Sequence, residues 1–180
     1  MNRYEYNDQI IEVFNEEADS PNNYSLIYFS GDENDYQVSH HGIRVFENGI
    51  AKASCLLIGF GGATGISENS SLIQENTLLV CCCDTIFCIN LPALQLNWKL
   101  KADLATCFQV LPLEKDFIVH GEVEISRIDI NGNVKWSFSG HDIFVCLDGT
   151  SAFELLSDHI LLHDFLGNSY MLDFHGKLMA

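Results

Sequence analysis

A repeat of about 40 residues is the feature that most constrains how this chain can fold. The segment Ile125–Trp136 aligns with Ile86–Trp98 and with Tyr170–Leu178, and a fainter copy lies at Val45–Ile50. Short β-branched and aromatic runs alternate with Asn-Gly, Asp-Gly and His-Gly turn signals, which is the pattern of an all-β protein. One strand-turn-strand unit must stack on its neighbours to bury its faces. We therefore predict a propeller-like array of about four antiparallel repeats.

The length and composition of the chain are those of one folded domain. Its 180 residues are 47% hydrophobic, which suffices for a sizeable core. We expect a single domain over residues 1–180, in which an acidic N-terminal segment (1–36) precedes the β-repeat body (37–180). The N-terminus has no signal-peptide pattern, and no apolar run is long enough to span a membrane. Seven cysteines, an odd number, suit reduced thiols, so we predict a cytoplasmic protein.

The start of the chain carries a pattern that is typical of a helix. Asp8 is a residue type that caps helices, and the spacing of Ile10, Val13 and Phe14 places their side chains on one helical face. Pro21 follows the pattern and would end it. The sequence therefore predicts a short N-terminal helix up to about residue 18.

The charge of the chain disfavours nucleic acid and anionic membranes as partners. Its net charge is −16, from 25 acidic and 9 basic side chains, so both would be repelled while a basic protein would be attracted. Nine of the acidic side chains lie in the first 36 residues. An acidic surface also serves solubility alone, and both interpretations stay open. The candidate partner-binding residues are Glu12, Glu16, Glu17, Asp19, Asp32, Glu33 and Asp35.

Three consecutive cysteines, Cys81, Cys82 and Cys83, precede Cys88 in the second repeat. If residues 84–85 form a hairpin turn, Cys81 and Cys83 share one sheet face with Cys88, and Cys82 lies on the other. Zinc sites use cysteines that are separated by a few residues, and consecutive strand residues point to opposite faces. We therefore predict no metal site and interpret these thiols as small buried hydrophobic groups.

A glycine-rich segment follows the strand-like run Cys55–Ile58. It lacks the lysine of a P-loop and does not open a helix, so nucleotide binding is not predicted. We interpret it as a connector or partner-contact loop, and its candidate residues are Gly59, Gly61, Gly62, Thr64 and Gly65. The competing class of function is a small-ligand or carbohydrate binder, or a hydrolase, that uses this loop with His40, His41 or Asp164.

The third repeat resembles a known family. It contains an apolar strand, a turn, a second strand ending at Asp129, a turn with Gly132 and a final strand with Trp136. This order resembles the blade repeat of pyrroloquinoline-quinone-type and WD-like β-propellers, over about residues 72–180. The resemblance implies that Trp136 and Trp98 are equivalent, mostly buried blade residues. The quinone enzymes of this family are exported and far longer than this chain, so no quinone cofactor is implied.

We predict a protein that binds and does not catalyse, because no residue set has the spacing of a catalytic site. Radial repeats present rigid surfaces and loops on which a partner can dock. The size, acidity and reduced thiols also match immunity proteins, which neutralise basic toxin domains. The predicted function is therefore a non-enzymatic protein-binding module for a basic partner. The array is a closed propeller, an open fragment or half of a homodimeric ring, and the sequence leaves these alternatives open.

Overall fold

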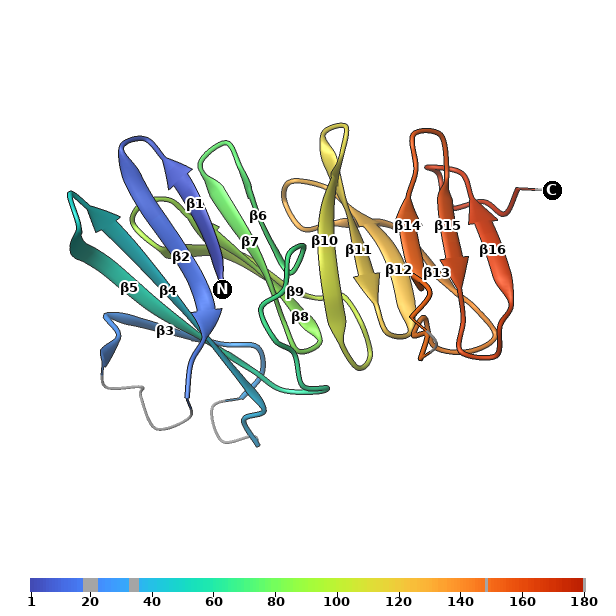
Figure 1. Cartoon of the computed structure of the whole chain (residues 1–180), viewed down its shortest axis with the longest axis horizontal. Coiled ribbons are helices and arrows are strands. Elements are labelled where there is room, and N and C mark those ends of the chain that lie inside the picture. Colours follow the sequence, from blue (N-terminus) through green and yellow to red (C-terminus); the bar gives the residue numbers. More distant parts are fainter. Residues whose placement is uncertain (18–22, 33–35, 148, 180) are drawn as a thin grey trace.

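Four β-sheets follow one another along the chain in the computed structural model (Figure 1). The structure describes residues 1–17, 23–32, 36–147 and 149–179, and this described part contains sixteen strands and no α-helix. It therefore also has no helix that could cross a membrane. The prediction of an all-β fold with several antiparallel repeats is confirmed.

Sheet 1 is formed by the first five strands, in the order β1-β2-β4-β5-β3. Neighbouring strands are antiparallel, except that β3 runs parallel to β5. Tight turns at Asn7-Asp8 and Asn48-Gly49, all with positive φ, join β1 to β2 and β4 to β5. The strands are β1 (Asn2–Tyr6), β2 (Gln9–Asn15), β3 (Leu26–Phe29), β4 (Ser39–Glu47) and β5 (Ile50–Gly59).

Sheets 2, 3 and 4 are antiparallel meanders in which the strands follow in chain order. Sheet 2 contains β6 (Ser71–Gln74), β7 (Thr77–Cys82), β8 (Thr85–Asn90) and β9 (Gln95–Lys101). Sheet 3 contains β10 (Cys107–Leu113), β11 (Asp116–Gly121), β12 (Glu124–Ile128) and β13 (Val134–Ser139). Sheet 4 contains β14 (Phe153–Leu155), β15 (Ile160–His163) and β16 (Ser169–Leu172). After β16, Leu178 pairs with Leu172 in an isolated bridge, where sheets 2 and 3 have a fourth strand.

The hydrophobic core lies between consecutive sheets, because each central strand buries both of its faces. In β7, Leu78 and Val80 pack toward sheet 1, whereas Leu79 and Cys81 pack toward sheet 3. A third cluster joins sheets 3 and 4. Burying one such aliphatic side chain contributes about 1.5–3 kcal/mol, so the stacking of neighbours stabilises the array.

The predicted N-terminal helix is wrong, because residues 9–15 form strand β2. Asp8 lies in the β1–β2 turn with a φ of +60° and does not cap a helix. Ile11 and Val13 are fully buried in the core, whereas Ile10 and Phe14 lie on the opposite face. The side-chain period is thus two, as β-branched residues favour. The predicted end of the helix at residue 18 lies outside the described residues.

An aromatic side chain fastens each sheet to the next, and we call this contact a latch. Trp98 Nε1 donates to the Ile130 carbonyl of sheet 3 at 3.0 Å, and Trp136 Nε1 donates to the Phe174 carbonyl after sheet 4 at 3.1 Å. Tyr28 of β3 likewise donates to a carbonyl before β9, that of Leu94, at 3.0 Å. Both indoles are partly buried against a core cluster. Their predicted equivalence is confirmed by these matching contacts.

The glycines of two turns are required because the latches cover them. A β-carbon on Gly132 would lie 2.8 Å from Cε3 of Trp98, and one on Gly176 would lie 2.6 Å from Cδ2 of Trp136. Both glycines have left-handed backbone, with φ of +80° and +77°. Asp129 holds the first of these turns by accepting the amides of residues 131 and 133. Each turn thus presents a flat backbone surface to an aromatic ring.

The array has two ends. Sheet 1 lies at one end and sheet 4 at the other (Figure 1), so the described chain does not close on itself. Each terminal sheet therefore packs on one neighbouring sheet, and no other sheet of the described residues covers its second face, although the Tyr24 side chain packs over Gly42 on that face of sheet 1. We call the outer face of sheet 1 the trailing face and the outer face of sheet 4 the leading face.

Candidate functional site

The glycine-rich loop connects sheet 1 to sheet 2, and its backbone amides bond within the chain. Gly62 N donates to the Ala105 carbonyl and Thr64 N donates to Ser39 Oγ, both at 2.9 Å. An anion-binding loop needs amides that point at a ligand. These two amides are already satisfied, so the loop does not have the geometry of a phosphate cradle.

The loop instead packs on the cysteine turn between β7 and β8, which the sequence did not indicate. A β-carbon on Gly59 would lie 2.6 Å from Cys83 Sγ and 2.7 Å from Cys82 Sγ. Cys83 N donates to Thr64 Oγ1 at 2.9 Å. Glycine is therefore required at position 59, because the two thiols occupy the space of a side chain.

The predicted register of the cysteines is wrong by two positions. Cys81 pairs with Ile86 and Cys82 pairs with Thr85, so the turn is Cys83-Asp84 and not residues 84–85. Cys83 has a φ of +53° and belongs to neither sheet face. The structural interpretation of the thiols agrees with their burial: six of the seven free cysteines are buried, and Cys146 is half-buried.

A buried polar cluster links the loop to β4. His41 Nε2 lies 3.1 Å from Thr64 Oγ1, and its Nδ1 lies 3.1 Å from the His40 carbonyl. Burial lowers the pKa of His41 to about 4, so its imidazole is neutral at pH 7. Because Nδ1–H then donates to the carbonyl, Nε2 accepts from the Thr64 hydroxyl, which itself accepts from the Cys83 amide. Every polar atom in this chain of contacts has a partner.

Cys83 is the most acidic thiol of the cluster. A hydrogen bond from the Cys82 thiol is the main cause that lowers the pKa of Cys83 to about 6, while burial raises the pKa of Cys82. The Cys83 side chain has no exposed surface. A reactive thiol needs access as well as thiolate character, so this sulfur is sealed inside the junction between sheets 1 and 2.

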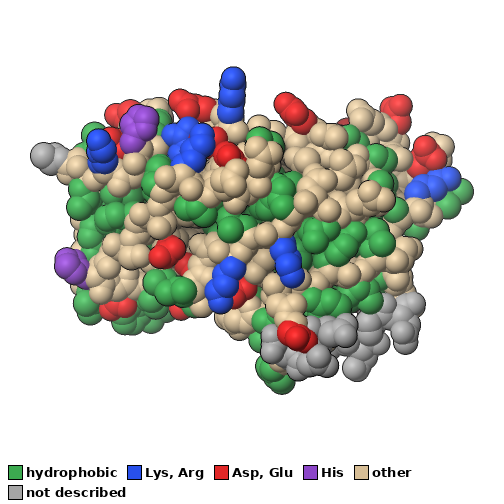
Figure 2. Space-filling model, turned by 180° about the vertical axis from the view of Figure 1, so that it is seen from behind, with side chains coloured by type: hydrophobic (Ala, Val, Ile, Leu, Met, Phe, Trp, Pro, Cys, Tyr) green, Lys and Arg blue, Asp and Glu red, His purple; other side chains and the backbone are tan. Residues whose placement is uncertain are grey.

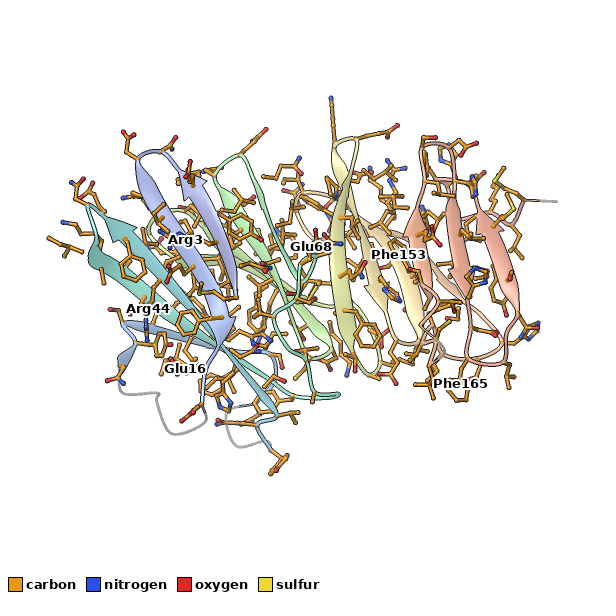
Figure 3. The ribbon with its side chains drawn as sticks, in the orientation of Figure 1. Arg3, Glu16, Arg44, Glu68, Phe153 and Phe165 are labelled. Atoms are coloured by element: carbon orange, nitrogen blue, oxygen red, sulfur yellow. The ribbon has the colours of Figure 1, made fainter. Side chains whose placement is uncertain are left out.

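Two candidate acidic residues form ion pairs on the trailing face. Glu12 lies 3.5 Å from Arg3, and Glu16 lies 3.4 Å from Arg44; Figure 3 labels Arg3, Arg44 and Glu16 on sheet 1. The Tyr24 hydroxyl also donates to Glu16. Burial and the Glu16 carboxylate raise the pKa of Tyr24. These two glutamates thus pair with charged and polar groups of the chain itself.

The remaining candidate acidic residues are either exposed or outside the described residues. Glu17 and Asp32 are exposed, and Asp19, Glu33 and Asp35 lie outside the described residues. From the side shown in Figure 2, acidic side chains lie scattered over the molecule with lysines and arginines between them. The visible negative charge on this side is thus dispersed over several sheets.

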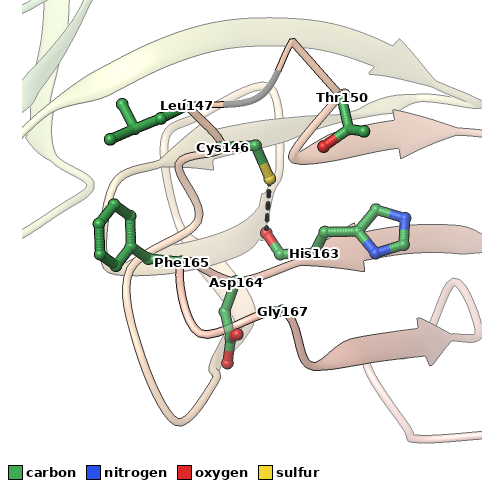
Figure 4. Close-up of a pocket in the computed structure, with 7 residues that line it drawn as sticks. All are labelled: Cys146, Leu147, Thr150, His163, Asp164, Phe165 and Gly167. Atoms are coloured by element: carbon green, nitrogen blue, oxygen red, sulfur yellow. Dashed lines mark hydrogen bonds between the residues drawn. The ribbon is translucent and has the colours of Figure 1, made fainter.

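A cavity of about 460 Å³ lies beside sheet 4 (Figure 4). Leu147 and Phe165 line it with 82% and 51% of their surfaces exposed, and the Cys146 thiol donates to the His163 carbonyl at its wall. The sequence prediction missed this site. The sequence signal that could have indicated it is the position of two large apolar residues, Leu147 and Phe165, two residues before the turn glycines Gly149 and Gly167. The lining residues are Cys146, Leu147, Thr150, His163, Asp164, Phe165 and Gly167.

The residues of the competing ligand-binding or hydrolase prediction meet only in part, because His41 contacts the loop through Thr64 whereas Asp164 does not. His40 and His41 lie on β4 of sheet 1, whereas Asp164 lies in the β15–β16 turn of sheet 4, at the other end of the array. Asp164 accepts bonds from the Asn168 amide at 2.8 Å and the Tyr170 hydroxyl at 2.7 Å. Burial raises its pKa, but these hydrogen bonds outweigh burial and lower it. Asp164 therefore holds a turn, as Asp129 does.

Comparisons with known proteins support the fold. No family model and no curated protein matches the chain. Among solved structures, the computationally designed Ika8 protein is similar, with a TM-score of 0.54, 11% identity and coverage of 99% of this chain and 59% of that chain. The WD40 β-propeller domain of Doa1 is similar with a TM-score of 0.50, 15% identity and coverage of 81% and 50%. The chain thus has a propeller-like repeat fold that spans about half of each structure.

Proposed function

We propose that this chain is a non-enzymatic protein-binding module that captures a basic partner. The observation that carries the proposal is the disposition of charge. Six of the nine cationic side chains form ion pairs with acidic groups of the chain itself, and the net charge is −16. Because the cations are largely neutralised locally, the field that reaches a partner is negative.

The cavity beside sheet 4 supports the same proposal, because it offers an apolar anchor point. Leu147, Phe165 and Leu166 are exposed by 82%, 51% and 69%. Exposed apolar groups of this size mark protein interaction sites, and binding energy concentrates where an apolar side chain fills a pocket. In this proposal, charge attracts the partner and the cavity holds one of its apolar side chains.

The kind of partner follows from charge and size. A small acidic chain of this type neutralises a basic toxin domain, such as a nuclease, in the manner of an immunity protein. Its acidic surface would cover the cationic groups with which such a toxin contacts nucleic acid. The propeller-like fold is a common scaffold for binding surfaces. The partner itself is identified by the capture experiment below.

The test is capture of the partner, followed by charge reversal at exposed positions. The tagged chain is used to isolate a partner from native lysate, and the binding of that partner is then measured with Glu5, Glu17 and Glu68 changed to lysine. All three residues are exposed, unlike Glu12 and Glu16, whose reversal would break internal ion pairs. The change moves the net charge from −16 to −10, two units for each residue.

We expect the triple reversal to slow association by about tenfold at low salt and to leave the melting temperature unchanged, because exposed charges contribute little to stability. The matched control changes the same three residues to glutamine, which alters the charge half as much and is expected to give half the effect on the logarithm of the rate. Capture of an acidic partner, or equal rates for all three proteins, would contradict the proposal.

A further inference from the structure

The turn at Asn48-Gly49 is a latch position that no aromatic ring covers. It joins β4 to β5, as the turns with Gly132 and Gly176 follow the third strands of sheets 3 and 4. Indole rings cover those two glycines, whereas no atom lies within 4 Å of a β-carbon built on Gly49. A cavity of about 210 Å³ adjoins the turn. The surface that receives a side chain from the preceding sheet elsewhere in the array is therefore open on sheet 1.

The trailing face around this turn combines an apolar floor with a rim of paired charges. Ile10 pairs with Phe46 across β2 and β4, and both point away from sheet 2. The next row of the same face carries Arg3, Glu12 and Arg44, in which the arginine side chains are 60% and 39% exposed. The cavity is lined by Arg3, Asp8, Ile10, Glu12, Phe46, Asn48 and Gly49.

The leading face at the other end of the array is apolar with an acidic residue. Glu154, Leu161 and Met171 form one row across sheet 4. This row points away from sheet 3, because the alternate row of Phe153, Leu162 and Tyr170 packs into the core. Leu178, bridged to the edge of β16, is 61% exposed. The leading face thus presents apolar groups where sheets 2 and 3 contact a following sheet.

We propose that two copies of this chain join head to tail, with the leading face of each packed on the trailing face of the other, to complete one ring. A contact between two different faces closes a ring when its rotation permits, and two such contacts are related by a two-fold axis. Of this chain, 81% covers 50% of the WD40 β-propeller domain of Doa1 and 99% covers 59% of the designed Ika8 protein, so two copies supply at least the arc of a whole propeller. This inference does not depend on the proposed function.

The chemistry of the two faces favours a second copy as the occupant. Leu161 and Met171 would meet Ile10 and Phe46, so apolar groups on both faces would leave water. The exposed carboxylate of Glu154 in the leading row would face arginines that already pair with Glu12 and Glu16, so apolar contact and not charge would hold the junction together. The net charge of −16 on each copy opposes association at long range, so added salt is expected to strengthen the dimer.

The test is the mass of the untagged protein in solution, measured by light scattering and sedimentation over a wide concentration range. A monomer has a mass of 20.2 kDa. We expect the average mass to rise with concentration to twice that value and to stop there. A mass that stays at 20.2 kDa at every concentration would overturn the proposal. A mass that grows without limit would also overturn it, because contacts that do not close a ring build filaments.

Complementary variants test the head-to-tail arrangement. Phe46→Glu blocks the trailing face and Met171→Glu blocks the leading face, so each variant alone is expected to be monomeric. A mixture of the two is expected to regain a dimer through the one intact junction. Pairing between identical faces would not be restored by mixing, and that result would refute the arrangement. If Phe46→Glu fails to fold, Arg3→Glu replaces it, because the Arg3 side chain is 60% exposed.

The matched control is Leu104→Glu. Leu104 is 71% exposed and lies between sheets 2 and 3, away from both end faces. The Leu104→Glu substitution introduces the same charge as the two face variants, so the dimer is expected to persist with unchanged affinity. Loss of the dimer in this control, or its persistence in both face variants, would show that the copies associate through another surface and would overturn the proposal.

Discussion

Gly132→Ala isolates the contribution of one latch to the stability of the array. Gly132 has a φ of +80°, and an L-residue held in this region costs about 1 kcal/mol. The new β-carbon would lie 2.8 Å from the Trp98 ring, so the indole must move. Displacement forfeits the bond from Trp98 Nε1 to the Ile130 carbonyl and some packing, about 2 kcal/mol more. We expect the free energy of unfolding to fall by about 3 kcal/mol.

Gly167→Ala is the control for backbone strain. Gly167 has a φ of +84° in a turn that Asp164 holds, and nothing lies within 4 Å of a β-carbon at this position. Its substitution is expected to cost only the strain, about 1 kcal/mol. Urea unfolding followed by circular dichroism gives both values, with equal slopes expected. Equal losses for the two variants would refute the claim that the latch stabilises the junction.

Three further results are expected. Asp116 bonds Lys135 at 2.8 Å and also pairs with Arg127; burial raises its pKa, but these cations outweigh burial and lower it. The stability that Asp116 contributes is thus present above its unfolded pKa and lost as the pH falls below it. Asp116→Asn should lower the free energy of unfolding by about 3 kcal/mol at pH 7 and weaken its decrease at acid pH, as measured by urea unfolding. An unchanged decrease at acid pH would contradict this. Burial lowers the pKa of His120 to about 4, so the unfolded chain binds the proton first. The free energy of unfolding therefore falls as the pH drops from about 6.5 to 4. His120→Phe should reduce that fall, and an identical pH profile for the variant would count against this explanation. Ellman titration of the native protein should detect Cys146 first, and seven thiols should appear after unfolding without reductant; fewer than seven would reveal a disulfide.

The repeat was predictable because specific residue types mark its turns in the sequence. Gly132 and Gly176 mark positions that only glycine suits, and the tryptophans that cover them also recur after about one repeat. The same reasoning applied to Asp164 identifies a turn, since Gly167 follows it as Gly132 follows Asp129. Reading Asp164 as a possible site residue neglected that pattern. Local turn chemistry thus carries much of the information about this fold.

The N-terminal strand and the cysteine register were not predictable with equal certainty. Ile10, Val13 and Phe14 fit a helical period, while Ile11 and Val13 fit a strand, and the partner strand β4 decides between them. Cys83 has a positive φ, which is uncommon for a residue other than glycine or asparagine, so a turn at Cys83-Asp84 lacks a strong signal. These outcomes depend on tertiary contacts that a single sequence does not display.

The candidate site was predictable only in part for a related reason. The glycine-rich loop and the cysteines were visible separately, but their contact through Gly59 arises from the packing of sheet 1 on sheet 2. Tyr28 was invisible as a latch because it comes from β3, the one parallel strand, and no tryptophan or glycine pattern marks it. Long-range contacts of this kind require the fold to be known first.

The association rate of the captured partner over a range of ionic strength tests the central claim most directly, that this acidic array binds a basic protein. Raising salt from 0.01 M to 0.15 M shortens the Debye length from about 30 Å to about 8 Å. The account predicts that the association rate falls by about tenfold or more, while the dissociation rate changes little. An association rate that does not depend on salt would contradict the claim and leave the acidic surface with a role in solubility alone.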